Sequence, residues 1–302
     1  MNPSSPSGAV LVVGSDCPIG KLLVTRWQTA GRKVLGTTRR RELVGANTLY
    51  LDLTEDLETW QCPPNVRVAI LCAGISKLEI CRQDPNGSFR VNVTGIVTLA
   101  RKLSEQGVFI VYPSTNHVFD GSIPLRKPEE STCPVTEYGV QKAEAEKQLL
   151  RLGDSVAVVR TAKIIGPEQS LFAKWAESLR RGQEIHPFSD MRLAPVPLSL
   201  AASVLHRVTE QRLPGVLQLS GDRDISYEEA ARIGARVLGA SEKLIQPILA
   251  AEAQIGPDPL FAHTTLNMDL LKTKLGVVPP EAYATVAAAF SLHEPDRSTE
   301  LM

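Results

Sequence analysis

Apolar, mostly β-branched runs alternate with amphipathic stretches over the first half of the chain. Strands are predicted at Val10–Val13, Lys33–Thr37, Thr48–Leu51, Val66–Cys72, Val108–Tyr112 and Ser155–Arg160. Helices are predicted between them, most clearly at Lys21–Ala30, Phe89–Gln106 and Tyr138–Leu152. Nearly continuous apolar runs are typical of strands buried on both faces, and their alternation with helices indicates a parallel sheet. The pattern therefore predicts an α/β protein.

The second half is less regular, because prolines interrupt the pattern after Arg160. It still predicts a helix near Leu171–Arg181 and a strand at Val216–Leu219 that returns to the main sheet. A further helix is predicted at Tyr227–Leu238, with Ser226 as its N-cap.

This change of pattern divides the chain. Residues 9–165 are expected to form the main domain and residues 166–292 a smaller C-terminal lobe. Residues 1–8 and 293–302 are expected to be loose ends, and the first of these segments has neither the charged region nor the apolar core of a signal peptide. The chain has 302 residues, of which 43% are apolar, so it can bury a large core.

Charge and cysteine content exclude several classes of function. Lys plus Arg and Asp plus Glu total 33 each, so the formal net charge is zero and no basic run favours nucleic-acid binding. No apolar run approaches the roughly 20 residues needed to span a bilayer. Five cysteines without CxxC spacing favour neither a disulfide framework nor a zinc site. We expect a cytoplasmic protein that holds no metal and binds neither nucleic acid nor a membrane.

The first strand leads directly into a glycine-containing turn and a helix. Backbone N–H groups of such a turn, together with the positive end of the helix dipole, can hold a pyrophosphate. Cys17 stands where a GxxGxxG spacing has its middle glycine, so an ordinary strand–turn–helix connection is the alternative. The candidate phosphate-binding residues are Gly14, Cys17, Pro18, Ile19 and Gly20.

The end of the second strand favours a particular dinucleotide. Thr38, Arg39 and Arg40 lie there, and arginines would suit the 2′-phosphate of NADPH, whereas an acidic residue would suit NADH. The alternative is a solvated charge run that continues through Arg41. We expect NADPH as the cofactor and leave NADH open.

Two further strand ends complete the candidate cofactor site. Asp52 and Leu53 close the third strand; Asp52 could accept a hydrogen bond from the adenine amino group, or Asp52 or Thr54 could cap a helix. The fourth strand closes with small residues that would let a cofactor approach the backbone, namely Cys72, Ala73 and Gly74. Together these segments predict a Rossmann-type, doubly wound parallel sheet.

Candidate chemistry lies on the helix that follows the fifth strand. Tyr138 and Lys142 are four residues apart, so both side chains share one helix face. A lysine ammonium there would lower the pKa of the phenol, and the tyrosine could then exchange a proton with a substrate oxygen. The pair follows a hydroxyl-rich segment, Ser114–Gly121, at the edge of the sheet where ligands bind. A surface pair that arose by chance is the alternative.

This combination resembles the extended short-chain dehydrogenase/reductases. Ser114–Gly121 followed by Tyr138 and Lys142 resembles the dTDP-4-dehydrorhamnose reductase branch in particular, and the resemblance covers about residues 9–290. It implies an oxidoreductase that reduces a nucleotide-linked 4-keto sugar with NADPH. It also implies that Thr115 is the catalytic hydroxyl, that Tyr138 is the proton donor, and that Lys142 binds the nicotinamide ribose and tunes Tyr138.

The substrate end matches the branch less well. Asn116 and His117 replace its usual Asp-Tyr and are weak candidates for substrate contact; for His117, packing or hydrogen bonding is favoured over a role as acid. The lobe over residues 166–292 is expected mainly to bind substrate. Its candidates for diphosphate contact are Lys174, Arg192 and Arg212.

Other functions remain open. The same branch includes the regulatory beta subunit of methionine adenosyltransferase, which binds NADP and acts through a partner. An epimerase or dehydratase that keeps its cofactor bound is a further alternative. A homodimer is compatible with the sequence.

Overall fold

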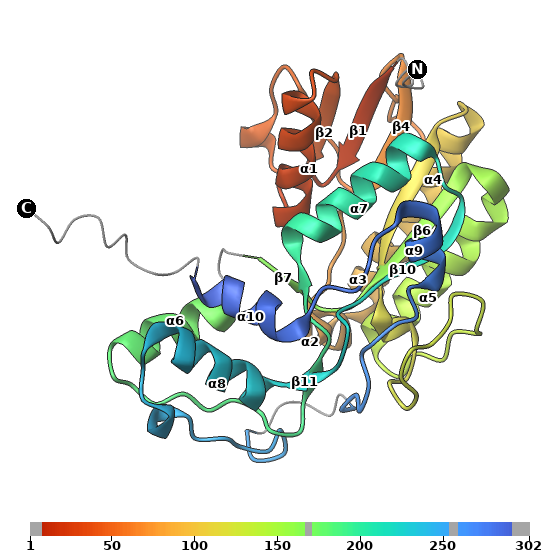
Figure 1. The fold of residues 1–302 in the computed structure, drawn as a ribbon. Coiled ribbons are helices and arrows are strands. Elements are labelled where there is room, and N and C mark those ends of the chain that lie inside the picture. Colours follow the sequence, from red (N-terminus) through yellow and green to blue (C-terminus); the bar gives the residue numbers. More distant parts are fainter. Residues whose placement is uncertain (1–7, 167–170, 254–258, 292–302) are drawn as a thin grey trace, which may run out of the picture.

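Seven parallel strands form the main sheet, in the order β10-β6-β5-β4-β1-β2-β3 (Figure 1). The structure is a computed structural model that describes residues 8–166, 171–253 and 259–291. The strands are β1 (Ala9–Val13), β2 (Val34–Thr38), β3 (Thr48–Tyr50), β4 (Val66–Leu71), β5 (Phe109–Thr115), β6 (Val156–Thr161) and β10 (Gly215–Leu219). The strand order reverses between β1 and β4, which is where open α/β sheets bind ligands. The predicted doubly wound α/β fold is confirmed.

Helices cover both faces of this sheet (Figure 1). On one face lie α1 (Pro18–Thr29), α7 (Leu198–Gln211) and α9 (Asp269–Leu275). On the other lie α4 (Ile96–Glu105) and α5 (Glu137–Leu149). The strands supply apolar side chains to both layers, as in β1, where Val10 and Val12 join the first cluster and Leu11 and Val13 the second. This two-sided burial explains why the strands read as continuous apolar runs.

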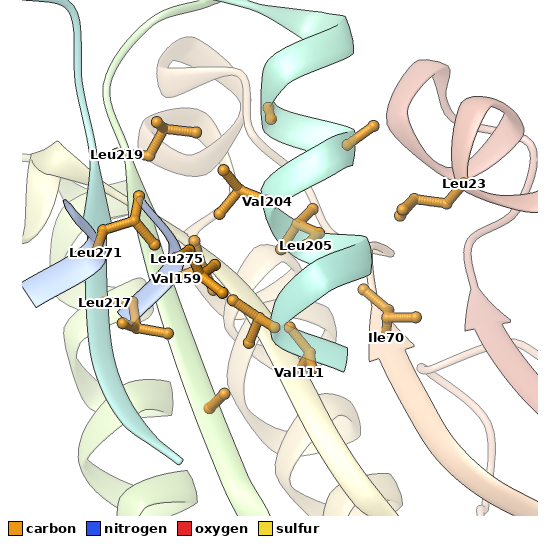
Figure 2. Close-up of a cluster of buried hydrophobic side chains, with 14 of the residues drawn as sticks. Leu23, Ile70, Val111, Val159, Val204, Leu205, Leu217, Leu219, Leu271 and Leu275 are labelled. Carbon is orange, nitrogen blue, oxygen red and sulfur yellow. The ribbon is translucent and has the colours of Figure 1, made fainter. Parts of the chain in front are cut away.

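Helix α7 was not predicted from the sequence. Prolines were interpreted as interruptions there, but Pro197 is the N-cap of α7, a place that tolerates proline because no intrahelical N–H is needed. The helix then presents Ala201, Val204, Leu205 and Val208 to the sheet at helical spacing. Figure 2 shows Val204 and Leu205 directed into the cluster that also contains side chains of β4, β5 and β6.

Three other helices form a separate cluster beside the sheet (Figure 1). They are α6 (Leu171–Arg180), α8 (Tyr227–Leu238) and α10 (Ala282–Ser291). Ser226 caps α8 in a reciprocal capping box with Glu229, in agreement with the predicted N-cap. Short strand pairs connect this cluster to the main body: β7 (Ile164–Ile165) with β9 (Val196–Pro197), and β8 (Arg192–Leu193) with β11 (Ile225–Ser226).

The helix predicted over Phe89–Gln106 consists of several segments. After α2 (Leu78–Gln83), α3 (Pro85–Phe89) leads into a π-helical stretch over Arg90–Gly95, and α4 follows without a break. Such π-helical insertions often lie at functional sites. Among the described residues, no helix is both long and apolar enough to cross a membrane.

Candidate active site

The turn after β1 lies at the point where the strand order reverses. Gly14 has a φ of 79°, and a Cβ there would come within 2.7 Å of the Ala73 backbone nitrogen. A Cβ on Gly20 would come within 2.5 Å of the Gly14 carbonyl oxygen. Only glycine fits either position, so the backbone of the turn lies close to the end of β4 and to the first turn of α1.

Cys17, which stands at the middle glycine position of the turn, has a structural role of its own. It is the N-cap of α1, which begins at Pro18, and its Sγ accepts from the Gly20 N–H at 3.3 Å. The Gly20 N–H, one of those predicted to face a phosphate, is therefore capped by a side chain of the turn itself.

The end of β2 contains an ion pair that sequence reasoning missed. Asp16 accepts from Thr38 Oγ1 at 3.1 Å and from Arg40 Nε at 2.9 Å. Arg39 is exposed and has no ion-pair partner among the described residues. The two arginines are thus not equivalent, because Arg40 is committed to Asp16 and only Arg39 is free to meet a ligand.

Asp52 is engaged locally after β3. Its Oδ1 accepts from both the backbone N–H and the hydroxyl of Thr54, at 2.8 Å each. The segment is a turn and not the start of a helix, so the N-cap alternative is wrong. Leu53 is buried, and its carbonyl oxygen lies against Gly95 of the π-helical stretch.

The loop after β4 is tied to the helix that carries Tyr138 and Lys142. Asn92, buried in the π-helical stretch, accepts from the Ile75 N–H at 2.8 Å and donates to the Ile75 carbonyl at 2.9 Å. Asn92 Nδ2 also donates to Gln141 of α5 at 2.8 Å. Asn92 thereby fixes the chain just beyond Cys72, Ala73 and Gly74. Sequence reasoning missed it, because a single asparagine in a helical pattern carries no distinctive signal.

Thr115 and Tyr138 meet at the carboxyl end of β5. Thr136 caps α5 by accepting from the Gly139 N–H, and this places Tyr138 in the first turn. The Thr115 hydroxyl accepts from the His117 N–H at 3.2 Å and lies close enough to Tyr138 to lower the pKa of its phenol slightly. Burial raises the pKa of the Tyr138 phenol, so the phenol keeps its proton near pH 7.

Burial has the largest effect on the pKa of Tyr138, and Lys142 is not among the groups that shift it in this structure, so the tuning of Tyr138 by Lys142 stays a prediction. Lys142 Nζ donates to the Pro113 carbonyl at 2.7 Å and lies 3.7 Å from the centre of the Tyr112 ring. Burial lowers the pKa of the Lys142 amine to about 7, so its charge at neutral pH is reduced. The Lys142 amine is also close enough to Cys72 for each to affect the pKa of the other. The candidate cofactor residues after β4 therefore lie near the Tyr138 and Lys142 pair on α5.

His117 lies beside the Thr115–Tyr138 pair. Its ring centre is 6.0 Å from that of Tyr138 and 4.6 Å from that of Phe261, both at edge-on angles. Burial, and then the nearby Lys163 charge, lower the pKa of the imidazole to about 4, so His117 is neutral near pH 7. Its buried Nδ1 has no hydrogen-bond partner among the described residues. Asn116 is buried next to it, with Oδ1 3.5 Å from Thr115 Oγ1.

Lys163 is a second residue that sequence reasoning missed. It follows β6 by two residues, and Thr161 of β6 is the register partner of Thr115. The side chain is exposed, yet desolvation lowers the pKa of its amine. Lys163 could have been identified from the sequence, because it closely follows a predicted strand at the edge of the sheet where ligands bind.

The basic residues predicted for diphosphate contact lie on or next to three different elements, α6, β8 and α7. Lys174 is exposed on α6, and Arg192 on β8 lies 3.6 Å from Glu229. Arg212, at the end of α7, donates to the Arg67 carbonyl near the start of β4, the opposite end of the sheet from Thr115. Arg212 is therefore excluded as a ligand contact at the candidate site.

Comparison with known sequences connects this arrangement to two kinds of protein. The chain is 23% identical over 256 residues to methionine adenosyltransferase 2 subunit beta of Rattus norvegicus, covering 80% of this chain and 76% of that protein. It is 24% identical over 264 residues to dTDP-4-dehydrorhamnose reductase of Mycolicibacterium smegmatis, covering 85% and 77%.

Solved structures share the fold over nearly the whole chain. The dTDP-4-dehydrorhamnose reductase of Bacillus anthracis str. Ames, solved in complex with NADP, superposes with a TM-score of 0.81 at 17% identity, covering 95% of this chain and all of that one. The family description "RmlD substrate binding domain" matches residues 8–292, which include every element of the sheet and the whole candidate site. The chain therefore belongs to the RmlD substrate-binding-domain family.

Proposed function

We propose that the protein is a cytoplasmic, NADPH-dependent reductase of a nucleotide-linked 4-keto sugar. The observation that carries the proposal is that Thr115 and Tyr138 lie close together, with Lys142, at the carboxyl edge of the sheet. The relatives of known structure include a dTDP-4-dehydrorhamnose reductase with NADP, which supports a nicotinamide cofactor and a sugar-nucleotide substrate. We assign residues 9–165 to cofactor binding and residues 166–292 mainly to substrate binding.

The described residues fit a dinucleotide. The glycine positions of the β1 turn admit no Cβ, and the small residues Cys72, Ala73 and Gly74 leave the neighbouring strand end open to a ligand. Arg39 would meet the 2′-phosphate of NADPH, and Asp52 would lie near the adenine. Lys142 would hold the nicotinamide ribose. When bound, NADPH supplies the hydride that reduces the sugar carbonyl.

The protein's own residues handle the proton. Tyr138 keeps its phenolic proton near pH 7 because burial raises its pKa, and it would deliver that proton to the carbonyl oxygen. Thr115 would position the same oxygen through its hydroxyl. Asn116 and His117 lie next to this pair and would contact the sugar, with the free His117 Nδ1 as one hydrogen-bonding group.

The direct test mixes the protein and NADPH with a panel of nucleotide-linked 4-keto sugars and follows the loss of nicotinamide absorbance. Turnover of at least one keto sugar supports the proposal. A specific observation favours one competing function: the match to methionine adenosyltransferase 2 subunit beta suggests a regulatory NADP-binding subunit. Tight NADPH binding without oxidation by any keto sugar, combined with an altered activity of a partner enzyme, would favour that function instead.

A further inference from the structure

Two cysteine side chains meet at the point where the strand order reverses. Cys17 caps α1 after β1, and Cys72 follows β4, the neighbouring strand. The Cys72 N–H donates to the Val13 carbonyl at 2.9 Å, which holds the two strand ends together. The turn that carries Cys17 packs against the residue after Cys72, since a Cβ on Gly14 would come within 2.7 Å of the Ala73 backbone nitrogen. The two thiols are close enough for each to shift the pKa of the other, and both cysteines are partly exposed and free of disulfides. An oxidant can therefore reach the pair.

The two thiols have different chemical characters. The neighbouring Cys72 thiol lowers the pKa of Cys17, and although burial opposes this, the N–H groups of Gly20 and Ile19 add to it, so that the pKa falls to about 7. The neighbouring Cys17 thiol and burial raise the pKa of Cys72 well above its ordinary value. Cys17 is thus the nucleophile and Cys72 the thiol that can resolve an oxidised Cys17, an arrangement found in redox-sensitive pairs.

We propose that Cys17 and Cys72 form a reversible disulfide that disables the cofactor turn, with a hydroperoxide as the oxidant. The proposal that these two cysteines are the ones oxidised depends only on their side chains and not on the proposed function. The consequence of their oxidation for cofactor binding rests on the proposed function, which places the pyrophosphate of NADPH over the same turn.

The oxidation proceeds in two balanced steps. The Cys17 thiolate attacks one oxygen of hydrogen peroxide, the O–O bond breaks, and the products are Cys17 sulfenic acid and hydroxide, which takes a proton to become water. The Cys72 sulfur then attacks the Cys17 sulfur. The S–O bond breaks, and the departing hydroxide leaves as a second water with the Cys72 proton. Both sulfurs are oxidised to a disulfide while one peroxide is reduced to two waters.

Disulfide formation should oppose cofactor binding. The bond would draw the sulfurs to a separation of about 2 Å, closer than a hydrogen bond allows. This pulls the cap of α1 toward β4 across the surface where the phosphates would lie. Binding and oxidation are then linked, so a bound cofactor must in turn slow oxidation of the pair.

The experiment treats the full-length protein with hydrogen peroxide, maps its cysteine-containing peptides by mass spectrometry, and measures NADP⁺ affinity by calorimetry before oxidation, after oxidation and after dithiothreitol. We expect a Cys17–Cys72 peptide that has lost two hydrogens. We also expect affinity to fall by about 10-fold or more, within the usual range for coupled sites, and to recover on reduction. Saturating NADP⁺ should slow formation of the linked peptide.

Matched serine variants test whether Cys17 and Cys72 are the two cysteines that form the disulfide. Cys72→Ser should leave Cys17 as a sulfenic or more oxidised acid without the linked peptide, and Cys17→Ser should form no linked peptide. Cys62→Ser should form it as the wild type does, because Cys62 lies half-buried in a separate loop beside Pro63.

Absence of the Cys17–Cys72 peptide from oxidised wild type would overturn the proposal, as would equal NADP⁺ affinities of the oxidised and reduced forms. If the reduced protein binds no NADP⁺, the proposed function fails, while the peptide map still decides whether the disulfide forms.

Discussion

Burial moves the pKa values of Tyr138 and Lys142 in opposite directions, and both shifts favour the neutral form. A tyrosine that stays protonated suits a proton donor, whereas a lysine with a pKa of about 7 is only partly charged when no ligand is bound. The charge of Lys142 therefore depends on what binds beside it. This coupling could not be predicted from the four-residue spacing, which places the two residues on one face but says nothing of their solvation.

Substitutions separate the roles of these residues. Tyr138→Phe keeps the ring and removes the acid, so turnover should fall about 10²–10⁴-fold, as is typical of general acid–base catalysis, while NADPH affinity changes little. Lys142→Met should lower both turnover and NADPH affinity, because it removes the proposed ribose contact. Thr115→Ala should lower turnover alone. Single-turnover NADPH oxidation and cofactor titration measure the two effects, and a Tyr138→Phe variant with wild-type turnover would eliminate Tyr138 as the donor.

His117 gives a pH prediction whose sign follows from its burial. Its pKa is lowered from 6.5 to about 4 in the fold, so the unfolded chain takes up a proton that the folded chain resists. This contribution to stability is fully present above about pH 6.5 and is lost as the pH falls toward about 4. Urea unfolding across this window should show the wild type losing up to about 3 kcal/mol relative to His117→Phe. A constant difference between the two proteins would contradict a buried neutral imidazole.

At the scale of elements, the site segments that directly follow a strand could be predicted from the sequence. The turn at Gly14–Gly20 and the residues at the end of β2 were identified from the sequence, because strand ends in a parallel sheet share one edge. The Asp16–Arg40 ion pair was not, because it joins two loops 24 residues apart. Helix α7 was missed because prolines at its start were interpreted as interruptions, although its apolar residues have helical spacing.

The ion pair divides the roles of two adjacent arginines. Arg39→Ala should remove most of any preference for NADPH over NADH, a loss of about 1.5–3 kcal/mol for a charge-assisted contact. Arg40→Ala should weaken both cofactors to a similar extent, since it releases Asp16 and disturbs the turn. Calorimetric titration of each variant with both cofactors gives the comparison. Equal affinities of the wild type for NADPH and NADH would remove the argument for Arg39.

Helix α5 is anchored to the sheet by a buried ion pair. Glu146 on α5 and Arg160 on β6 are both almost fully buried, and Arg160 Nη2 lies 2.8 Å from Glu146 Oε2. Glu146→Gln leaves the arginine uncompensated, so the free energy of unfolding should fall by about 3–5 kcal/mol. The matched control is Glu144→Gln, whose side chain is more exposed and whose loss should cost less than about 1 kcal/mol. Urea denaturation that shows equal losses in both variants would refute this anchoring role.

At the scale of the whole molecule, the fold class followed from the sequence, but the division of the chain is less sharp than its pattern suggested. Residues after 166 contribute β10, α7 and α9 to the body built on the main sheet, whereas α6, α8 and α10 form their own cluster. The return of the Val216–Leu219 strand to the main sheet was predicted, and β10 pairs with β6. Helices α7 and α9 pack on the same sheet through tertiary contacts that the local hydrophobic pattern did not reveal.

The proposed reductase activity rests on membership of the RmlD substrate-binding-domain family and on the closeness of Thr115 to Tyr138. The most direct test measures NADPH oxidation by the wild type and by Tyr138→Phe with a panel of nucleotide-linked 4-keto sugars. The account predicts that at least one sugar is reduced by the wild type, with one NADPH consumed per sugar, and that Tyr138→Phe binds NADPH normally but turns over about 10²–10⁴-fold more slowly. Wild-type protein that binds NADPH tightly and reduces no sugar in the panel would contradict it.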